Sequence, residues 1–234
     1  MADFNDVLEI VHSEGYWRVV LRPTQFHKAR LRDKAHCQRA VYNAAVGSAS
    51  GHYPTLVDRP TDEGTDWIGT GVNVLTVIEY WRFFQSGQFV HHIATKEDHM
   101  GRLGLWHPQF FVPGEGRRYL AITATVHLLT DLLEFAARLA YGEILVPSAS
   151  LTIEINRMDG RQLTFMMPGR RLPEVYWFKD DRIELTRALA AENLIGRSDE
   201  IAIELATDLF SRAGWNAPWA ILAEDQRRYK ENRR

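Results

Sequence analysis

Alternating and clustered apolar positions predict strands in every third of the chain. Residues 16–22 are rich in aromatic and β-branched side chains and stop at Pro23, which is typical of a strand. Residues 74–85 and 88–95 are two aromatic-rich runs joined at Ser86-Gly87, and this pattern predicts an antiparallel hairpin. Further strands are predicted at residues 151–156, 161–166, 175–178 and 182–185.

Turn residues predict two more hairpins. Met158-Asp159-Gly160 lies between residues 151–156 and 161–166, and an Asp-Gly pair is typical of a tight turn. Residues 179–181 separate the last two predicted strands in the same way.

Apolar side chains surround most of the helix predicted at residues 119–141, which indicates a central, buried position. Glycine and proline residues interrupt regular secondary structure in two segments. They predict a long acidic loop at residues 52–73, with Trp67 as its apolar anchor, and an irregular connection at residues 99–116. Shorter helices are predicted at residues 33–46, 188–195, 198–213 and 221–228.

Together these elements predict one α+β domain over residues 1–234. We expect a mostly antiparallel sheet of about five or six strands, with the long helix and two or three further helices packed on it. Residues 226–234 are basic and are expected to form a solvated tail.

Both faces of the hairpin at residues 74–95 are apolar. Trp81 and Phe83 share one face with Glu79, whereas Tyr80 and Arg82 share the other. We therefore expect helices to cover one face and the long loop or a partner to cover the other. A hairpin enclosed in one subunit, beside converging imidazoles and carboxylates, would favour an enzyme instead.

Composition narrows the classes of function. Lys and Arg number 28 against 30 Asp and Glu, so a net charge of −2 argues against nucleic-acid binding by bulk charge. The single cysteine, Cys37, permits no intramolecular disulfide and is expected to be a small core residue. Neither a signal peptide nor a membrane-spanning run is present, and we expect a cytoplasmic protein.

Two groups of polar residues are candidates for chemistry. His91 and His92 precede an acidic turn that contains Glu97, Asp98 and His99, but adjacent strand residues point to opposite faces, which disfavours a metal site. The long helix carries a second group along one stripe, in which an imidazole and a carboxylate could form an acid–base pair or a ligand-facing wall: His127, Asp131, Glu134 and Arg138.

Other candidates are binding surfaces. The acidic loop is expected to be solvated, and its carboxylates lack the accompanying lysine of a nuclease site. The hairpin aromatics favour core packing, with a protein-contact face as the alternative. A basic group could bind phosphate or an acidic partner, with ordinary surface charge as the alternative; its members are Arg157, Arg161, Arg170 and Arg171. The complete set of candidate binding residues is Trp67, Tyr80, Trp81, Phe83, His91, His92, His127, Asp131, Arg157, Arg161, Arg170 and Arg171. We assign no catalytic residue, metal ligand or cofactor.

Four segments carry a resemblance to a known type of region: Asp66-Trp67-Ile68-Gly69, EYWRFFQSGQFVHHIATKED, LLEFAARLA and LAEDQRRY. From residue 16 to residue 229 the chain resembles a bacterial region found C-terminal to Schlafen/AlbA-type DNA-binding or ATP-binding domains. The resemblance implies a regulatory or defence-related role and no catalytic residues. Because only a short segment precedes residue 16, we expect the region to act through a separate partner.

Our first hypothesis is therefore a non-enzymatic interaction or sensor domain that assembles with a partner protein or with itself, in regulation or phage defence. The second is a nucleic-acid-associated module that uses the basic turns and tail. The third is a metal-dependent hydrolase or nuclease that uses the imidazoles and carboxylates of residues 91–99.

Overall fold

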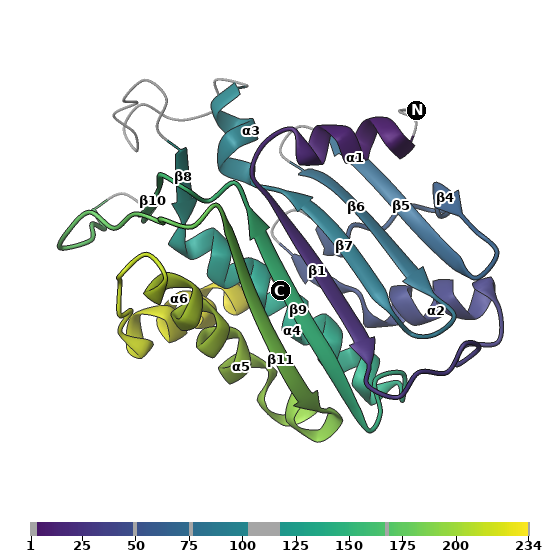
Figure 1. Ribbon diagram of the computed structural model, residues 1–234. Coiled ribbons are helices and arrows are strands. Elements are labelled where there is room, and N and C mark those ends of the chain that lie inside the picture. The colour runs from purple at the N-terminus through teal and green to yellow at the C-terminus, as the bar shows by residue number, and fades with distance from the viewer. Residues whose placement is uncertain (1–3, 49–50, 75–76, 103–117, 167–168, 234) are drawn as a thin grey trace.

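The computed structural model describes residues 4–48, 51–74, 77–102, 118–166 and 169–233. Within them, seven strands form one antiparallel sheet in the order β11-β9-β1-β7-β6-β5-β4 (Figure 1). The predicted α+β class is confirmed, with slightly more strands than expected. The strands of this sheet are β1 (Tyr16–Pro23), β4 (Asp62–Glu63), β5 (Trp67–Val74), β6 (Val77–Phe84), β7 (Phe89–Ala94), β9 (Ser148–Asn156) and β11 (Arg182–Ala190).

Two smaller sheets flank the large one. In the first, β2 (Val46–Ser48) pairs with β3 (Gly51–Tyr53), and in the second, β8 (Arg118–Ala121) pairs in parallel with β10 (Arg161–Thr164). The helices are α1 (Phe4–His12), α2 (Lys34–Ala44), α3 (Lys96–Arg102), α4 (Ile122–Tyr141), α5 (Ala191–Ser211) and α6 (Trp219–Asn232).

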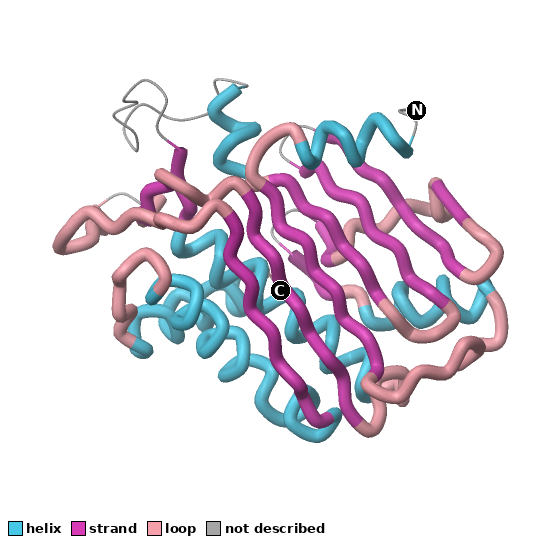
Figure 2. Tube along the Cα trace, in the orientation of Figure 1, coloured by secondary structure: helices cyan, strands magenta, loops and turns pink. Residues whose placement is uncertain are grey.

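Helices cover the two faces of the sheet unequally. Helix α4 crosses the back of the sheet in the view of Figure 1, with α5, α6 and α2 beside it, and the main hydrophobic core lies between this layer and the strands. Helix α1 lies on the front face, over β5, β6 and β7, whereas none of the helices in the described ranges lies over the front of β1, β9 and β11 (Figure 2).

The β6–β7 hairpin forms as predicted. Gly87 takes a positive φ of 84° in the turn, which a glycine adopts without strain, and Phe84 donates its backbone N–H to the Gln88 carbonyl at 2.9 Å. Trp81 and Phe83 on the back face are completely buried in the main core. The turn and its aromatic flanks were therefore sufficient to identify the central hairpin.

The second face of the hairpin is covered by α1, and not by the long loop or a partner as expected. Val7 and Val11 of α1 are buried against Ile78 and Tyr80 of β6. The apolar side chains of both faces are thus accommodated within one chain, which removes the original reason for placing a partner there.

Residues 52–73 are not one long loop, because three strands occupy much of this range. Tyr53 ends β3, β4 follows, and β5 pairs with β6 along its whole length. The sequence predicts that Gly69 is a loop residue, but it lies inside β5, where a Cβ would come within 2.8 Å of the Trp81 carbonyl oxygen. The glycine permits close packing of adjacent strands instead of flexibility.

The turn at Asp159-Gly160 forms, with Gly160 at a φ of 66°, but its two flanking strands do not pair with each other. Strand β9 pairs with β1 and β11, and β10 pairs with β8. The predicted hairpin of residues 175–185 is also wrong: Trp177 makes only an isolated bridge, to Gln162, and β11 continues to Ala190 before α5 begins.

Several helix boundaries also differ from the prediction. The helices predicted at residues 188–195 and 198–213 form one element, α5, which begins at Ala191 and has non-helical backbone angles at Arg197. Residues 118–121 form β8, so the central helix begins at Ile122. Residues 226–232 belong to α6 and are not a solvated tail, because Gln226 and Tyr229 are buried. The predicted connection at residues 99–116 is α3 as far as Arg102, and its remainder lies outside the described residues.

None of the helices in the described part of the chain has the length and apolar character needed to cross a membrane.

Candidate ligand-binding pocket

A cavity of about 140 Å³ lies at one end of the sheet, between the strands and α4. Its strand side is the start of β1, the start of β6 and the end of β7, which the antiparallel register brings to the same end. The first turn of α3, the β2–β3 hairpin and α6 complete the wall. The polar lining residues are Ser48, His52, Tyr53, Thr55, Glu79, Lys96, Glu97, Thr125, His127, Asp131 and Tyr229.

Glu79 is the buried carboxylate on the strand side of the cavity and is only 6% exposed. Its Oε1 accepts the backbone N–H of Thr55 at 2.8 Å, and its Oε2 lies 3.6 Å from Nε2 of the buried His91. Burial alone would raise the pKa of Glu79, but His91 and the hydrogen bond from Thr55 outweigh it and lower the pKa. Glu79 therefore brings a negative charge to the cavity.

Tyr53 joins this group from β3. Its hydroxyl lies 3.2 Å from Nδ1 of His91, so the imidazole is held between a phenol and a carboxylate. Burial raises the pKa of Tyr53, and the nearby charge of Glu79 adds to the effect. The phenol consequently stays neutral and can donate or accept a hydrogen bond.

Glu97 enters the cavity from the first turn of α3. Its Oε1 accepts the backbone N–H of Ala121 at 2.7 Å, which joins α3 to the start of α4. Burial raises the pKa of Glu97 despite that hydrogen bond. Two carboxyl groups in one cavity thus have pKa values shifted in opposite directions.

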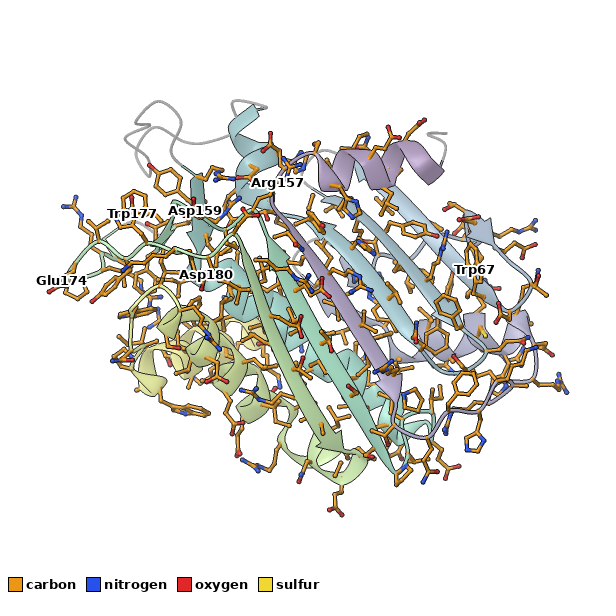
Figure 3. All side chains as sticks on the ribbon, viewed as in Figure 1. Trp67, Arg157, Asp159, Glu174, Trp177 and Asp180 are labelled. Carbon is orange, nitrogen blue, oxygen red and sulfur yellow. The ribbon has the colours of Figure 1, made fainter. Side chains whose placement is uncertain are left out.

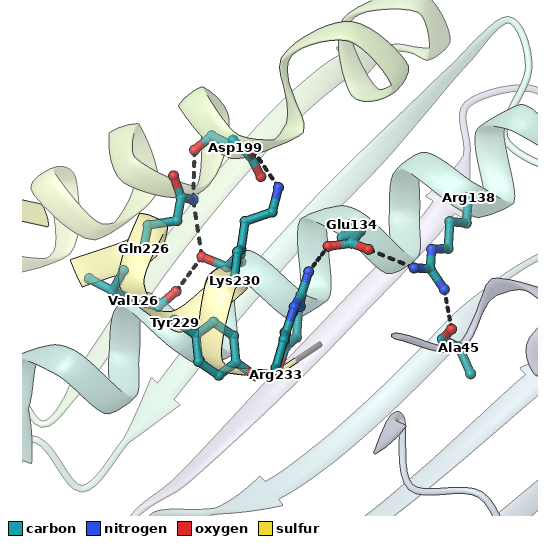
Figure 4. A network of polar contacts seen from close by, with 11 residues as sticks. Ala45, Val126, Glu134, Arg138, Asp199, Gln226, Tyr229, Lys230 and Arg233 are labelled. Atoms are coloured by element: carbon teal, nitrogen blue, oxygen red, sulfur yellow. Dashed lines mark hydrogen bonds and ion pairs between the residues drawn. The ribbon is translucent and has the colours of Figure 1, made fainter. Parts of the chain in front are cut away.

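Asp131 of α4 connects the cavity to α6. Its Oδ2 accepts the Tyr229 hydroxyl at 2.5 Å, and its Oδ1 accepts from the Arg233 guanidinium at 2.5 Å. Arg233 also binds Glu134, which in turn pairs with Arg138 (Figure 4). Burial raises the pKa of Asp131 to about 6 even though both hydrogen bonds oppose the shift.

His127 lies one turn before Asp131 on the same helix face. Its ring stacks on Tyr229, with centroids 3.9 Å apart and an interplanar angle of 13°. Burial, followed by the charge of Lys96, lowers the pKa of His127 to about 4. At neutral pH this imidazole is therefore uncharged.

Thr125 has an unsatisfied hydroxyl at the cavity wall. Its side chain is 2% exposed, and Oγ1 has no hydrogen-bond partner among the described residues. By contrast, the nearby Thr130 donates to the Val126 carbonyl at 2.7 Å. A buried hydroxyl without a partner costs free energy, and an occupant of the cavity would supply the missing partner.

The helix stripe predicted from the sequence is brought together at this site: His127 and Asp131 line the cavity, while Glu134 and Arg138 extend the network behind it. His91 lies beneath the cavity, but His92 faces the opposite side of the sheet, where its Nδ1 is 2.9 Å from His12 Nε2.

The acidic turn after β7 is not assembled as a single metal-binding group. Glu97 lines the cavity, whereas Asp98 binds Arg161 through both oxygens at 2.7 and 2.9 Å. The described residues contain no group of three or more His, Cys, Asp and Glu side chains that could hold a metal ion.

The predicted arginines are dispersed and mostly engaged within the chain. Arg157 donates to the Ser13 carbonyl at 2.6 Å, Arg170 pairs with Asp225, and Arg171 is exposed. Arg161 is not at the surface at all: it is 0% exposed.

The predicted aromatic residues are also dispersed. Figure 3 shows Trp67 toward the right of the molecule and Arg157 near its top centre, so the two are well separated in this view. Trp81 and Phe83 are core residues, and Tyr80 lies under α1. Trp81 nevertheless supports the cavity, because its Nε1 donates to the Thr55 carbonyl at 2.9 Å.

The cavity residues that sequence reasoning missed include Tyr53, Glu79, Thr125 and Tyr229. Glu79 had a visible signal, since it is a lone charge inside the apolar run VIEYWRFF. The other three are common residue types without a local motif, and only the fold brings them to the same cavity.

Comparison of the chain with protein-family models, with curated proteins and with solved structures finds no match. The resemblance to the Schlafen-associated region therefore stays a prediction, and function must be inferred from the cavity itself.

Proposed function

We propose that this protein is a ligand-responsive interaction domain. A small molecule occupies the cavity at the end of the sheet, and helix α6 transmits its presence to a partner protein or to a second copy of the chain. The hairpin is enclosed within one chain beside a cavity with imidazole and carboxyl groups, which is the arrangement that favours an enzyme, so catalysis is kept below as the second candidate. The sensor hypothesis no longer depends on the aromatic hairpin and depends on the cavity instead.

The composition of the cavity supports ligand binding. Apolar walls with a few convergent polar groups are typical of small-molecule sites, and this cavity combines Trp17, Ile93 and Leu120 with buried carboxyl groups. Carboxyl groups with shifted pKa values also gather at functional sites more often than elsewhere. Glu97 and Asp131 both have this property here.

The observation that carries the proposal is the dual position of Asp131. It lines the cavity, and it also anchors α6 through Tyr229 and Arg233. A ligand that changes the charge or hydrogen bonding of Asp131 must therefore change the interactions that hold α6.

The outer face of α6 offers a surface for the response. Trp219 is 47% exposed and Ile221 is 37% exposed at the start of the helix, close to Arg227 and Arg228 in sequence. Exposed tryptophan and arginine side chains are frequent in protein interfaces. Movement of α6 would present or withdraw these side chains.

The test uses a side chain that imitates an occupied cavity. Ala124 lines the cavity on α4, and Ala124→Leu places extra apolar volume there. We expect faster or slower amide hydrogen exchange in α6 than in the wild type, together with a change in oligomeric state measured by light scattering. Ala188→Leu, at an exposed position of β11, is the matched control.

Native mass spectrometry of the protein purified under mild conditions then looks for a bound small molecule directly. If no small molecule is retained and neither Ala124→Leu nor added metabolites changes exchange in α6, the sensor proposal is wrong.

A second candidate function is acid–base catalysis on a small molecule. It is favoured by a carboxyl group with a raised pKa, Glu97, in the same cavity as the neutral imidazole of His127. Incubation with a metabolite extract, followed by mass spectrometry, tests this candidate. A compound consumed by the wild type and spared by Glu97→Gln would favour the enzyme over the sensor.

A further inference from the structure

We propose that the cavity selects a small organic amine in its protonated, ammonium form, with one end apolar and about the size of benzylamine. This inference rests on the proposed function, because it names the chemical class of the ligand for that same cavity.

Charge favours a cation. Carboxyl groups reach the cavity from three separate elements: Glu79 from β6, Glu97 from α3 and Asp131 from α4. The basic side chains of the lining are not buried charges: Lys96 and His52 are exposed, and His127 is uncharged at neutral pH. An anion inside would be repelled by the carboxylate of Glu79, whereas an ammonium group would be attracted to it. Glu97, whose pKa burial raises, and Asp131, which pairs with Arg233, add acceptor oxygens more than net negative charge.

Hydrogen-bonding capacity favours an ammonium over a cation without N–H groups. The hydroxyl of Thr125 has no partner in the described structure and can accept a hydrogen bond. Glu79 Oε2 lies 3.6 Å from Nε2 of His91, and a carboxylate oxygen can accept more than one hydrogen bond. An ammonium group carries the several N–H donors that such acceptors need.

Size and shape favour an amine with a compact apolar end. A cavity of about 150 Å³ is known to hold benzene, and this one measures about 140 Å³. Its apolar and aromatic walls include Trp17, Ile93 and Tyr229. Aromatic faces also attract a nearby cation, so the two ends of the ligand suit the same enclosure.

The test compares three probes of one shape and different charge: benzylammonium, benzyl alcohol and benzoate, at pH 7 and equal ionic strength. Isothermal titration calorimetry measures the affinity of each for the whole chain, and thermal unfolding confirms the order. We expect benzylammonium to bind at least about tenfold more tightly than the other two, since a charge-assisted hydrogen bond contributes that much. Magnesium chloride is included as a divalent cation without an apolar end.

Two variants locate the binding. Glu79→Gln removes the charge and should weaken benzylammonium binding about tenfold or more. Thr125→Val removes only the hydroxyl, which has no partner to lose, so it should fold at least as well as the wild type and weaken binding about two- to tenfold. Glu154→Gln and Thr152→Val, on β9 outside the cavity lining, are the matched controls and should bind like the wild type.

Equal or tighter binding of benzyl alcohol or benzoate would overturn the amine inference and leave the sensor proposal standing. Binding of magnesium alone, binding of none of the probes, or unchanged affinity in Thr125→Val would overturn it as well. If benzylammonium binds as expected but hydrogen exchange in α6 does not change, the ligand class is right and the sensor proposal is wrong.

Discussion

At the scale of single residues, the buried carboxyl group of Asp131 links stability to pH. Burial raises its pKa from an ordinary value of 3.8 to about 6, so the folded state favours the protonated form. The stability that protonation contributes is therefore complete at low pH and is lost as the pH rises through about 6. Because the carboxyl group is only 4% exposed, the shift corresponds to about 2–3 kcal/mol.

We expect Asp131→Asn, which cannot ionise, to remove the loss of stability that accompanies ionisation of Asp131 as the pH rises. Urea denaturation between about pH 4 and pH 7 should show a flatter dependence of the unfolding free energy on pH than in the wild type. Asp181→Asn, at an exposed turn, is the control and should follow the wild type. A wild-type dependence that survives in Asp131→Asn would assign the effect to another group.

Single residues also show how much of the cavity could be predicted from the sequence. Helical periodicity placed His127 and Asp131 on one face, and the structure confirms that they line one cavity. Their neighbours there come from distant segments, Tyr53 from about 75 residues earlier and Tyr229 from about 100 residues later, and no local pattern connects them. Periodicity therefore identifies one wall of a site, whereas the opposite wall depends on tertiary packing.

At the scale of elements, helix α1 keeps the hairpin from being an exposed apolar surface. Val7 and Val11 cover Ile78 and Tyr80, and each buried valine contributes about 1.5–3 kcal/mol. We expect the double substitution Val7→Asp and Val11→Asp to detach α1 and cause self-association, measured by light scattering. Glu9→Lys, on the exposed side of α1, should stay at the wild-type mass. A double variant of unchanged mass would mean that the hairpin needs no cover.

Elements were predicted more successfully than their pairing. The strand at residues 16–22 and the β6–β7 hairpin were correct because their signals are local: aromatic and β-branched runs and a two-residue turn. Strand β10 was found, but its partner was not. Its first residue, Arg161, donates to the Tyr119 carbonyl and to Asp98, so long-range polar contacts favour β8 over the adjacent β9.

At the scale of the whole molecule, the pair of Arg161 and Asp98 ties together four segments. Asp98 lies on α3 and accepts the Gly15 backbone N–H at 3.0 Å, at the junction of α1 and β1, while Arg161 brings in β10 and the Tyr119 carbonyl of β8. Their side chains are 7% and 0% exposed. Loss of either partner would leave a buried charge uncompensated.

We expect Asp98→Asn to lower the free energy of unfolding by about 3–5 kcal/mol, measured by urea denaturation. Unfolding should remain one transition, with tryptophan fluorescence and far-ultraviolet circular dichroism coinciding, because the main core is continuous from the sheet to α5. Glu184→Gln, which breaks an exposed pair, should leave the stability nearly unchanged. Separate transitions for the two signals would indicate independent folding units.

Trp17 lies in the wall of the cavity and is 4% exposed, so the protein carries its own optical probe at the place where a ligand would enter. Displacement of solvent next to the indole should shift its emission, and subtracting the spectrum of Trp17→Phe would separate this signal from those of the other tryptophans. Libraries of unlabelled compounds could then be screened against the unmodified chain, before any partner or reaction is known.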